Sequence, residues 1–319
     1  CRLFPKSPTL LQVKMIRLRL AALVAAMGCS CSSSVVAQEG DDMCVLQKLF
    51  AKGERSSEKK AERSGNFAFV LLSEPSLPET QAVIEAFREF AAPGESLQVG
   101  ADDSENGSSD EAFSLTLNTG EKSIVVLMPI AVPNGEADQG ARFSLSSFRN
   151  NWKLPPHHAH LAVMLRAAPD AKPTAALSRF TSLLAAVTKA SDAVGVYWGN
   201  AGATHDSEFF TSVASKQGVV PRIMLWSGVS VAREKDGRLS LLSLGMEQLK
   251  LPNLLLVAGE SSAGVAVPTM YDLLAYVAER GKPLPDGDTV GRTGEERLPV
   301  RYTKSPVDAE KRVWRVELP

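Results

Sequence analysis

The sequence has little cysteine and little histidine, and neither is spread evenly along the chain. Its 319 residues include four cysteines and four histidines. No cysteine follows residue 44, because the four are Cys1, Cys29, Cys31 and Cys44. The rest of the chain therefore has no thiol for a disulfide framework, an all-cysteine zinc site or a cysteine nucleophile. We predict no cofactor and no metal centre.

Long apolar runs are also lacking. The run from Leu20 to Gly28 is too short to cross a membrane, and it follows a basic start at residues 15–19. This pattern is typical of an export signal. Ala26-Met27-Gly28-Cys29 loosely resembles a lipoprotein cleavage box. If Met15 is the true start, residues 15–37 are signal-like, and we expect an exported or lipid-anchored protein.

The alternative start is Met43, which would make the residues before it a mis-called gene start. Residues 43–50 are typical of the first residues of a cytosolic protein, and the charged stretch 52–63 predicts a disordered lead-in. We favour Met43, and therefore expect a cytoplasmic protein without membrane contact. In both cases residues 1–64 form an N-terminal extension.

The net charge of −1 hides an asymmetry between this extension and the rest. Residues 1–64 hold 11 Lys and Arg against 6 Asp and Glu, which leaves 24 basic and 30 acidic residues in 65–319. A mildly acidic folded part argues against a general nucleic-acid binder. The expected partner is a protein or a small ligand.

The stretch from Pro221 to Gly259 predicts the centre of the C-terminal half. Residues 223–231 are rich in β-branched and aromatic residues, which favours a strand. Asp236-Gly237 is a strong hairpin signal, and a second strand follows it from Leu239. Residues 246–249 indicate a short helix, and the apolar run 254–257 predicts a buried strand.

Several segments resemble a bacterial family known as domain of unknown function 4261. They are LWSGVSV, LLSLGMEQLKLPNLLLVAG and MYDLLAYVAERG, with FVLLSEPSLPE and AVGVYWGNAGATHDSEFF further upstream. The resemblance would cover most of the chain after Gly65. It implies a fold but no activity.

Elsewhere, strands and helices alternate. Strands are predicted at 67–72, 112–117, 123–130, 160–165 and 194–198, with three short ones after 286; helices follow Pro78, Pro173, Thr204 and Tyr271. This order predicts an α+β fold with mixed or antiparallel sheets and helices on one face, in the form of two ferredoxin-like βαββαβ units in tandem. We assign residues 65–219 and 220–319 to two domains.

Two segments carry incomplete motifs. Asp102, Asp103 and Glu105 lie in an acidic loop that lacks the ligand spacing of a calcium-binding EF-hand, so a solvated loop is favoured. Ser261 follows a strand and precedes a helix, as in a nucleophile elbow, but the second glycine comes one residue late. No histidine lies downstream, and His205 would require a different chain order.

The segment from Tyr197 to His205 is the candidate ligand site. A small-residue loop there joins a strand to a predicted helix, and such loops can bind phosphate through backbone N–H groups. It lacks the P-loop and dinucleotide fingerprints. Polar and aromatic groups nevertheless gather at this strand end, so we predict any ligand pocket here, lined by Tyr197, Trp198, Asn200, Thr204 and His205.

The remaining histidines gather before the strand at 160–165. His158 and His160 share a face, so they could supply two ligands to a metal, and the third would be His157, His205 or a carboxylate. Because Pro155-Pro156 precedes them, a solvated strand entry is favoured. Glu247 is interpreted as a cap or ion-pair residue without a catalytic role.

These patterns leave three hypotheses for function. The favoured one is a non-catalytic protein that binds another protein or a small ligand. The second is a hydrolase that uses the Trp198–His205 region or Ser261. The third is an exported, lipoprotein-like structural protein, which depends on Met15 as the start.

Overall fold

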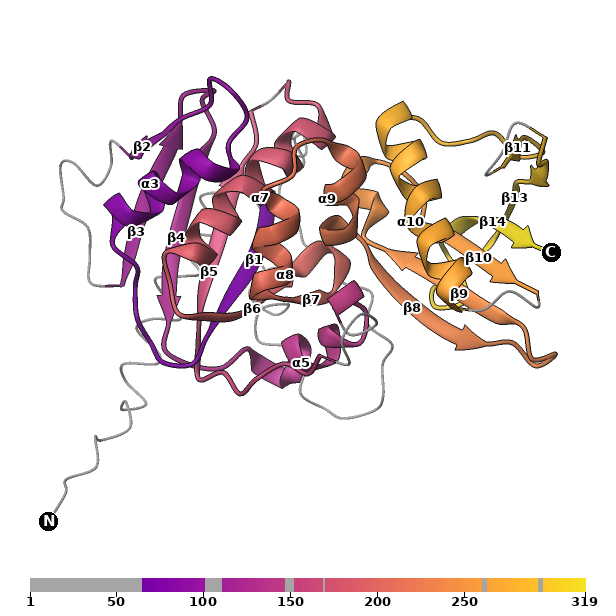
Figure 1. Ribbon diagram of the computed structural model, residues 1–319, viewed down its shortest axis with the longest axis horizontal. Helices are drawn as coiled ribbons and strands as arrows, with labels where there is room; N and C mark the ends of the chain where they lie inside the picture. The colour runs from indigo at the N-terminus through magenta and orange to yellow at the C-terminus, as the bar shows by residue number, and fades with distance from the viewer. Residues whose placement is uncertain (1–64, 101–110, 147–151, 169, 260–262, 292–294) are drawn as a thin grey trace, which may run out of the picture. The chain divides into compact units, whose positions relative to one another are not determined.

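The computed structural model describes residues 65–100, 111–146, 152–168, 170–259, 263–291 and 295–319. Within it, Asn66–Pro319 form one compact unit (Figure 1). All four cysteines, Met15, Met43 and the acidic residues 102–105 lie outside the described residues. Among the described residues, no helix combines the length and the apolar character needed to cross a bilayer.

A seven-stranded sheet forms the N-terminal half, with the strand order β2-β3-β4-β5-β1-β6-β7. The predicted strand at 112–117 has the predicted bounds, and the other predicted strands agree within two residues. The short strands β2 and β7 were not predicted. The bounds are β1 (Gly65–Leu72), β2 (Leu97–Val99), β3 (Ala112–Leu117), β4 (Lys122–Met128), β5 (Ala159–Arg166), β6 (Ala193–Trp198) and β7 (Ala203–Asp206).

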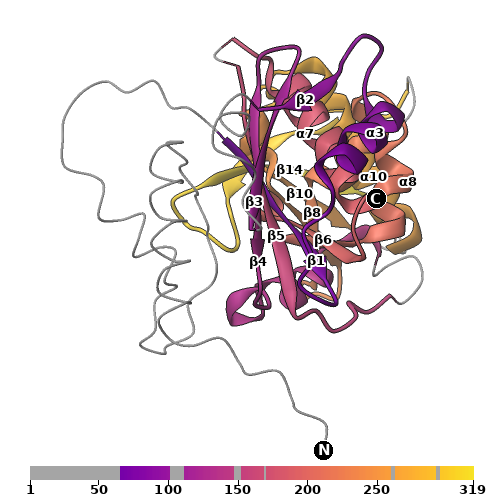
Figure 2. The ribbon, with the colours of Figure 1, turned by 90° about the vertical axis from the view of Figure 1, so that its left-hand side faces the viewer.

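Helices cover one face of this sheet (Figure 2). Alternate strand residues such as Val70 and Val163 are fully buried and share one hydrophobic core with Phe87 and Phe180 of the helices. The opposite face near β7 is covered by α5 (Glu136–Ala141), which follows the short 3₁₀ helix η1 (Pro133–Gly135). The helices on the first face are α3 (Thr80–Phe90), α7 (Pro173–Lys189), α8 (Ser207–Ala214) and α9 (Val219–Trp226).

A five-stranded sheet forms the C-terminal half, with the order β13-β14-β10-β9-β8. β10 and β14 are parallel and the other pairs are antiparallel, so the sheet is mixed. Helix α10 (Ala263–Arg280) packs on β9 and β10. The remaining elements are β8 (Gly228–Arg233), β9 (Leu239–Leu244), η3 (Met246–Leu249), β10 (Leu254–Ala258), β11 (Thr289–Val290), β12 (Leu298–Pro299), β13 (Arg301–Lys304) and β14 (Arg312–Leu318).

The α+β fold class is confirmed, but two βαββαβ units in tandem are not. Between β8 and β14, α10 is the one α-helix in the described part of the chain, so a second such unit is not seen there. The division into domains at residue 219 stays a prediction. Helix α9, which begins there, packs against α7 and α8 on one side and α10 on the other.

The predicted strand at 223–231 is wrong in its first half, because residues up to Trp226 belong to helix α9. Gly218, at φ 97°, precedes the helix, and Pro221 lies in its first turn, where a missing N–H does no harm. Trp226 then donates its indole N–H to Thr181 Oγ1 of α7 at 2.8 Å. Packing between helices therefore overrides the local β preference of this segment.

Arg222 is a fully buried cation that connects its own helix, α9, to α3, α7 and α8. Its guanidinium donates to the carbonyl oxygens of Ser178 (2.9 Å), Ala214 (2.7 Å), Phe90 (3.1 Å) and, through Nε, Lys216 (3.0 Å). Phe90 and Ala214 are the last residues of α3 and α8. The cation therefore faces the negative dipole ends of both helices and satisfies carbonyls that have no partner within their helix.

Replacing Arg222 by methionine keeps a long side chain but removes these donors. We expect the free energy of unfolding to fall by about 3 kcal/mol or more, because four carbonyl oxygens each lose a charged donor, although those of Phe90 and Ser178 keep the Ser182 hydroxyl. Urea denaturation followed by tryptophan fluorescence measures this. The control is Arg233→Met on the exposed end of β8, which should change stability by less than about 0.5 kcal/mol. Equal losses in both variants would contradict the role assigned to Arg222.

Candidate functional site

The predicted ligand site forms the last hairpin of the seven-stranded sheet. β6 ends at Trp198, the 3₁₀ helix η2 (Gly199–Ala201) makes the turn, and β7 returns antiparallel to β6. The prediction that Thr204 caps a helix is wrong, because Thr204 lies in β7. The cap of α8 is Asp206, whose Oδ2 accepts from the Phe209 N–H at 3.3 Å.

Four of the five predicted pocket residues are buried. Trp198, Thr204 and His205 have no exposed surface, Tyr197 is 9% exposed, and Asn200 alone is exposed. The strand register separates them into two sets, because Tyr197 pairs with Thr204 while Val196 pairs with His205. Trp198 and His205 therefore face the helices, and Tyr197 and Thr204 face α5. The five residues do not converge on one cavity.

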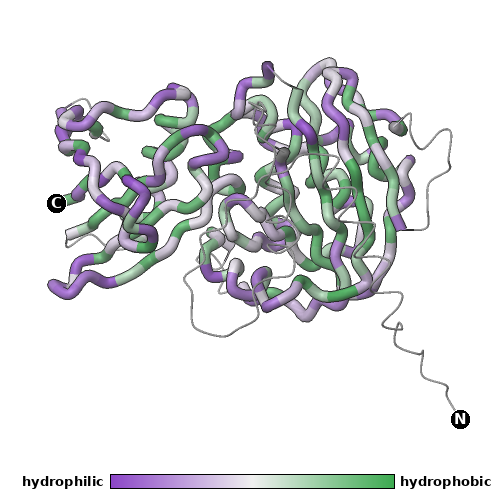
Figure 3. The backbone as a smooth tube through the Cα atoms, turned by 180° about the vertical axis from the view of Figure 1, so that it is seen from behind, coloured by the Kyte–Doolittle hydropathy of each residue, from purple (hydrophilic) through white to green (hydrophobic). Residues whose placement is uncertain are grey.

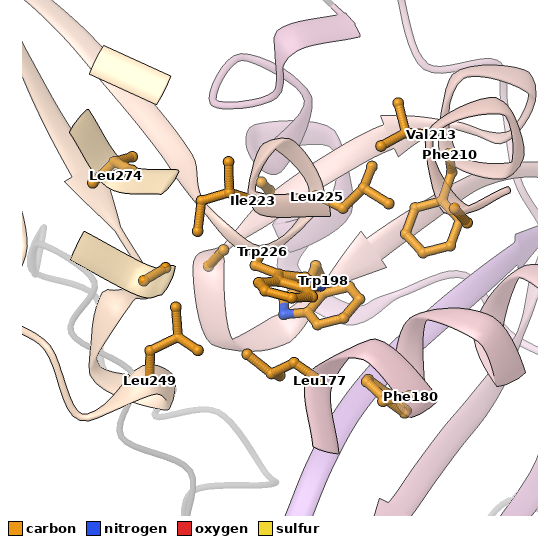
Figure 4. Close-up of a cluster of buried hydrophobic side chains, with 14 of the residues drawn as sticks. Leu177, Phe180, Trp198, Phe210, Val213, Ile223, Leu225, Trp226, Leu249 and Leu274 are labelled. Atoms are coloured by element: carbon orange, nitrogen blue, oxygen red, sulfur yellow. The ribbon is translucent and has the colours of Figure 1, made fainter. Parts of the chain in front are cut away.

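The Trp198 indole is held by a side chain from the other sheet. Its Nε1 donates to Gln248 Oε1 at 3.0 Å. The Gln248 Nε2 donates to the carbonyl oxygens of Trp226 (2.6 Å) and Gly245 (2.7 Å). Around this polar contact, Trp198 packs in a cluster that includes Leu177 and Phe180 (Figure 4). We call Gln248 and its three partners the Gln248 clamp.

Gly245 lets η3 approach the Trp198 turn closely enough for the clamp to form. It has φ 91°, and a Cβ at this position would lie 2.8 Å from the Ala201 Cα. An L-residue here would meet both backbone strain and a clash. The predicted short helix at 246–249 is confirmed, and its role is to fasten the five-stranded sheet to the turn after β6.

Thr204, His205 and Tyr197 are also engaged inside the fold, although His205 Nδ1 has no hydrogen-bond partner among the described residues. Thr204 Oγ1 donates to the Ala137 carbonyl oxygen at 2.6 Å. His205 Nε2 donates to the Leu225 carbonyl oxygen at 3.1 Å, and Tyr197 stacks on Phe69. The polar and aromatic residues that gather at this strand end therefore form a structural junction within the fold.

A comparison with known protein families concerns the segment that contributes Gln248 and Gly245 to the clamp. Residues 242–317 match the family model of a domain of unknown function, DUF4261. The match confirms the predicted resemblance for the segment that contains η3, β10 and α10, and it covers less than half of the chain. The likeness of the upstream segments stays a prediction. No curated protein and no solved structure matches the chain.

The matched segment contains Gly245 and Gln248, so the DUF4261 match includes the clamp's contribution from the five-stranded sheet. It also contains Glu247, which is exposed. Glu247 Oε1 accepts from Asn253 Nδ2 at 3.0 Å and pairs with Lys311 Nζ at 3.3 Å. These contacts agree with the interpretation of Glu247 as an ion-pair residue.

His157 and His158 precede β5 and His160 lies in it, and two of these three histidines are more deeply buried than a solvated strand entry would be. His157 and His160 are buried and only His158 is exposed, so that expectation is wrong for two of the three. His157 Nε2 accepts from the Val132 N–H at 3.3 Å, and His160 Nδ1 bonds to the Ile130 carbonyl oxygen at 2.8 Å. Among the described residues, no group of His, Cys, Asp and Glu is arranged to hold a metal ion.

Ser261 lies outside the described residues, so its geometry does not enter the site. The flanking elements are as predicted, with β10 ending at Ala258 and α10 beginning at Ala263.

A separate open depression of about 320 Å³ lies between the β1–α3 and α7–β6 connections. No residue of the predicted site lines it. Its lining is Ser76, Leu77, Pro78, Glu79, Lys189, Ala190, Ser191 and Asp192.

Sequence inspection missed Gln248 and Arg222, the two polar residues with the most extensive buried contacts. One signal was present for each. Arg222 is a charge within the apolar run from Val219 to Trp226, and Gln248 follows a glycine that requires a positive φ. Neither signal identifies the partners in other elements, such as Trp198 for Gln248 and Phe90 for Arg222, because those lie many residues away in the chain.

Replacing Gln248 by alanine removes the side-chain partner of the Trp198 N–H and of the Trp226 carbonyl oxygen, while the Gly245 carbonyl oxygen keeps the backbone N–H of residue 248 at 3.3 Å. We expect the free energy of unfolding to fall by about 2–4 kcal/mol, measured by urea denaturation. Gly245→Ala should also destabilise, by its clash with Ala201. The matched control is Gln81→Ala on the exposed side of α3, which should cost less than about 0.5 kcal/mol. A Gln248 variant as stable as that control would refute the clamp.

Acid should weaken the fold through His160 and His205. Burial lowers the pKa of each to about 4, although the hydrogen bond to a backbone carbonyl oxygen partly opposes this. Because both folded-state pKa values lie below the ordinary value, the unfolded chain binds more protons between pH 6.5 and 4. Stability is therefore lost as pH falls through this window, by about 3 kcal/mol for each histidine.

The test compares the wild type with His205→Leu from pH 7 to pH 4. Measured against its own value at pH 7, the variant should lose about 3 kcal/mol less than the wild type. His158→Ala, which changes an exposed histidine, serves as the control and should follow the wild-type profile. If His205→Leu has the same pH profile as the wild type, the pKa of His205 is not lowered in the folded protein.

Proposed function

We propose that the folded part of this chain is a non-catalytic binding module that acts on another protein through its surface. One observation carries the proposal. In the Trp198–His205 segment, where a pocket was predicted, Trp198, Thr204 and His205 each form a hydrogen bond within the fold, and the Tyr197 ring stacks on Phe69. Groups committed in this way are poor candidates for contact with a substrate.

The depression between the β1–α3 and α7–β6 connections also favours a protein partner over a small ligand. Its cation, Lys189, forms an ion pair with Glu89, and its other charged residues are Glu79 and Asp192. Small-molecule sites are usually concave and largely apolar with a few converging polar groups. An open, mixed-charge depression fits the surface of an interaction module better.

We place this module in the bacterial cytosol, following the expectation that Met43 is the start. The alternative is an exported, lipid-anchored protein that matures at Cys29. Membrane fractionation with sequencing of the mature N-terminus separates the two. A mature chain that begins at Cys29 in the membrane fraction would overturn the cytosolic placement.

A hydrolase is the second candidate, because the strand-to-helix context around Ser261 is the one that a nucleophile elbow requires. Its base would not be His205, which is fully buried in the junction with Nε2 bonded to Leu225. Ester hydrolysis by the purified protein that disappears in Ser261→Ala would favour this candidate over a binding module.

The binding function is tested by retention of a partner. The protein carries an affinity tag on a flexible linker after Pro319, is expressed from its own locus and is purified under mild conditions. We expect mass spectrometry to find one protein in a near-equimolar amount, which also rebinds after separate purification. The tag and linker alone serve as the control. Failure of every retained protein to rebind the purified chain would contradict the proposal.

A further inference from the structure

In the edge hairpin β13–β14, two of the directly opposed residue pairs consist of two cations. Arg301 pairs in register with Arg315, and Lys304 pairs with Arg312. Like charges in directly opposed positions of an antiparallel pair destabilise it. The four cations fall on both sides of the hairpin, because residues three positions apart in a strand point to opposite faces.

Most of this positive charge has no ion-pair partner among the residues that the structure describes. Arg315 pairs with Glu317 at 2.7 Å, and Glu317 also pairs with Arg238. Among the described residues, Arg301, Lys304 and Arg312 form no ion pair. The Arg312 guanidinium instead lies 5.5 Å from the centre of the Tyr302 ring and donates to the Tyr302 carbonyl oxygen.

The hairpin is basic, whereas the folded part of the chain as a whole is acidic. Its strands contain four cations and one carboxylate, Glu317, whereas residues 65–319 as a whole are acidic. The nearby carboxylates are already engaged. Asp286 accepts from the Tyr302 N–H, and Asp308 pairs with Lys311. Unneutralised cations in opposed positions are a local departure from a stable hairpin, and such departures are expected at functional sites.

At Tyr302, the backbone N–H and carbonyl oxygen of this edge strand are already hydrogen-bonded and cannot pair with a further strand. Asp286 Oδ1 accepts from its N–H at 2.9 Å, and Arg312 donates to its carbonyl oxygen at 3.1 Å. A partner would therefore bind through the side chains of the hairpin and not by extending the sheet. Guanidinium groups form two-pronged hydrogen bonds with carboxylates, so acidic side chains complement this surface best.

We propose that the β13–β14 hairpin binds an acidic segment of a partner protein. This inference rests on the proposed binding function and specifies its surface. An acidic peptide fits better than a nucleic acid, because phosphate binding over many nucleotides requires an extended basic surface. Here the basic residues occupy one hairpin of an acidic folded part.

The test uses a fluorescein-labelled peptide of alternating Glu and Gly, titrated with the full chain at low salt and followed by anisotropy. In the double variant Arg301→Glu with Lys304→Glu, affinity should fall by about tenfold or more. This variant should fold normally, because each new carboxylate would face an arginine of β14 and replace a repulsive pair by an attractive one. Its urea midpoint should equal or exceed that of the wild type.

A matched control carries the same change of net charge at the other edge of the sheet. Arg233→Glu with Lys235→Glu alters the β8–β9 hairpin, whose hydrophilic tip is visible in Figure 3. It should leave peptide affinity within about twofold of the wild type. Equal weakening by both variants, or no binding of the acidic peptide at low salt, would overturn the proposal. So would tighter binding of single-stranded RNA than of the peptide.

The tagged protein separates this inference from the binding function. If the partner retained by the wild type is also retained by the Arg301→Glu, Lys304→Glu variant, the hairpin assignment is wrong and the binding function stands. Loss of that partner from this variant, with retention by the control variant, supports both.

Discussion

The Gln248 side chain makes the contact on which the junction of the two sheets depends. One amide group satisfies the Trp198 indole, the Trp226 carbonyl oxygen and the Gly245 carbonyl oxygen. These partners come from the end of β6, the end of α9 and the loop after β9. A partly buried amide that uses both its N–H donors and its oxygen acceptor fixes the relative placement of these segments more narrowly than apolar contact alone. Arg222 supports the same region by holding the ends of α3 and α8 on the neighbouring helices.

Local patterns predicted much of the fold. Alternation of apolar residues gave β3 with its bounds, Pro173 began α7 as predicted, and Asp236-Gly237 closed the β8–β9 hairpin. Failures occurred where a distant partner decides the structure. Residues 219–226 are helical because Trp226 and Arg222 bond to α7 and its neighbours, and Thr204 lies in a strand because β6 pairs with it. The bonds from Trp226 and Arg222 to α7 span tens of residues, whereas the β6–β7 hairpin is local; neither kind of contact leaves a periodic pattern in the sequence.

The same reasoning explains why the predicted site became a structural junction. Tyr, Trp, Thr and His line ligand pockets because each combines an apolar body with a polar tip. That combination equally suits a core where two sheets meet and where every buried polar atom needs a partner. Composition alone does not distinguish the two cases. Burial and hydrogen bonding do, and they leave the charged edge β13–β14 as the more promising surface for a partner.

Exchange of the indole N–H protons with solvent deuterium tests the central claim most directly. The chain has four tryptophans, and their indole resonances can be assigned with single Trp→Phe variants. If the Trp198–His205 segment is a closed junction, the Trp198 and Trp226 indole protons will exchange only as fast as the whole protein unfolds. Exchange of the Trp198 proton within seconds in the folded protein, while Trp226 stays protected, would mean that the Trp198 end is open to solvent and would contradict the account.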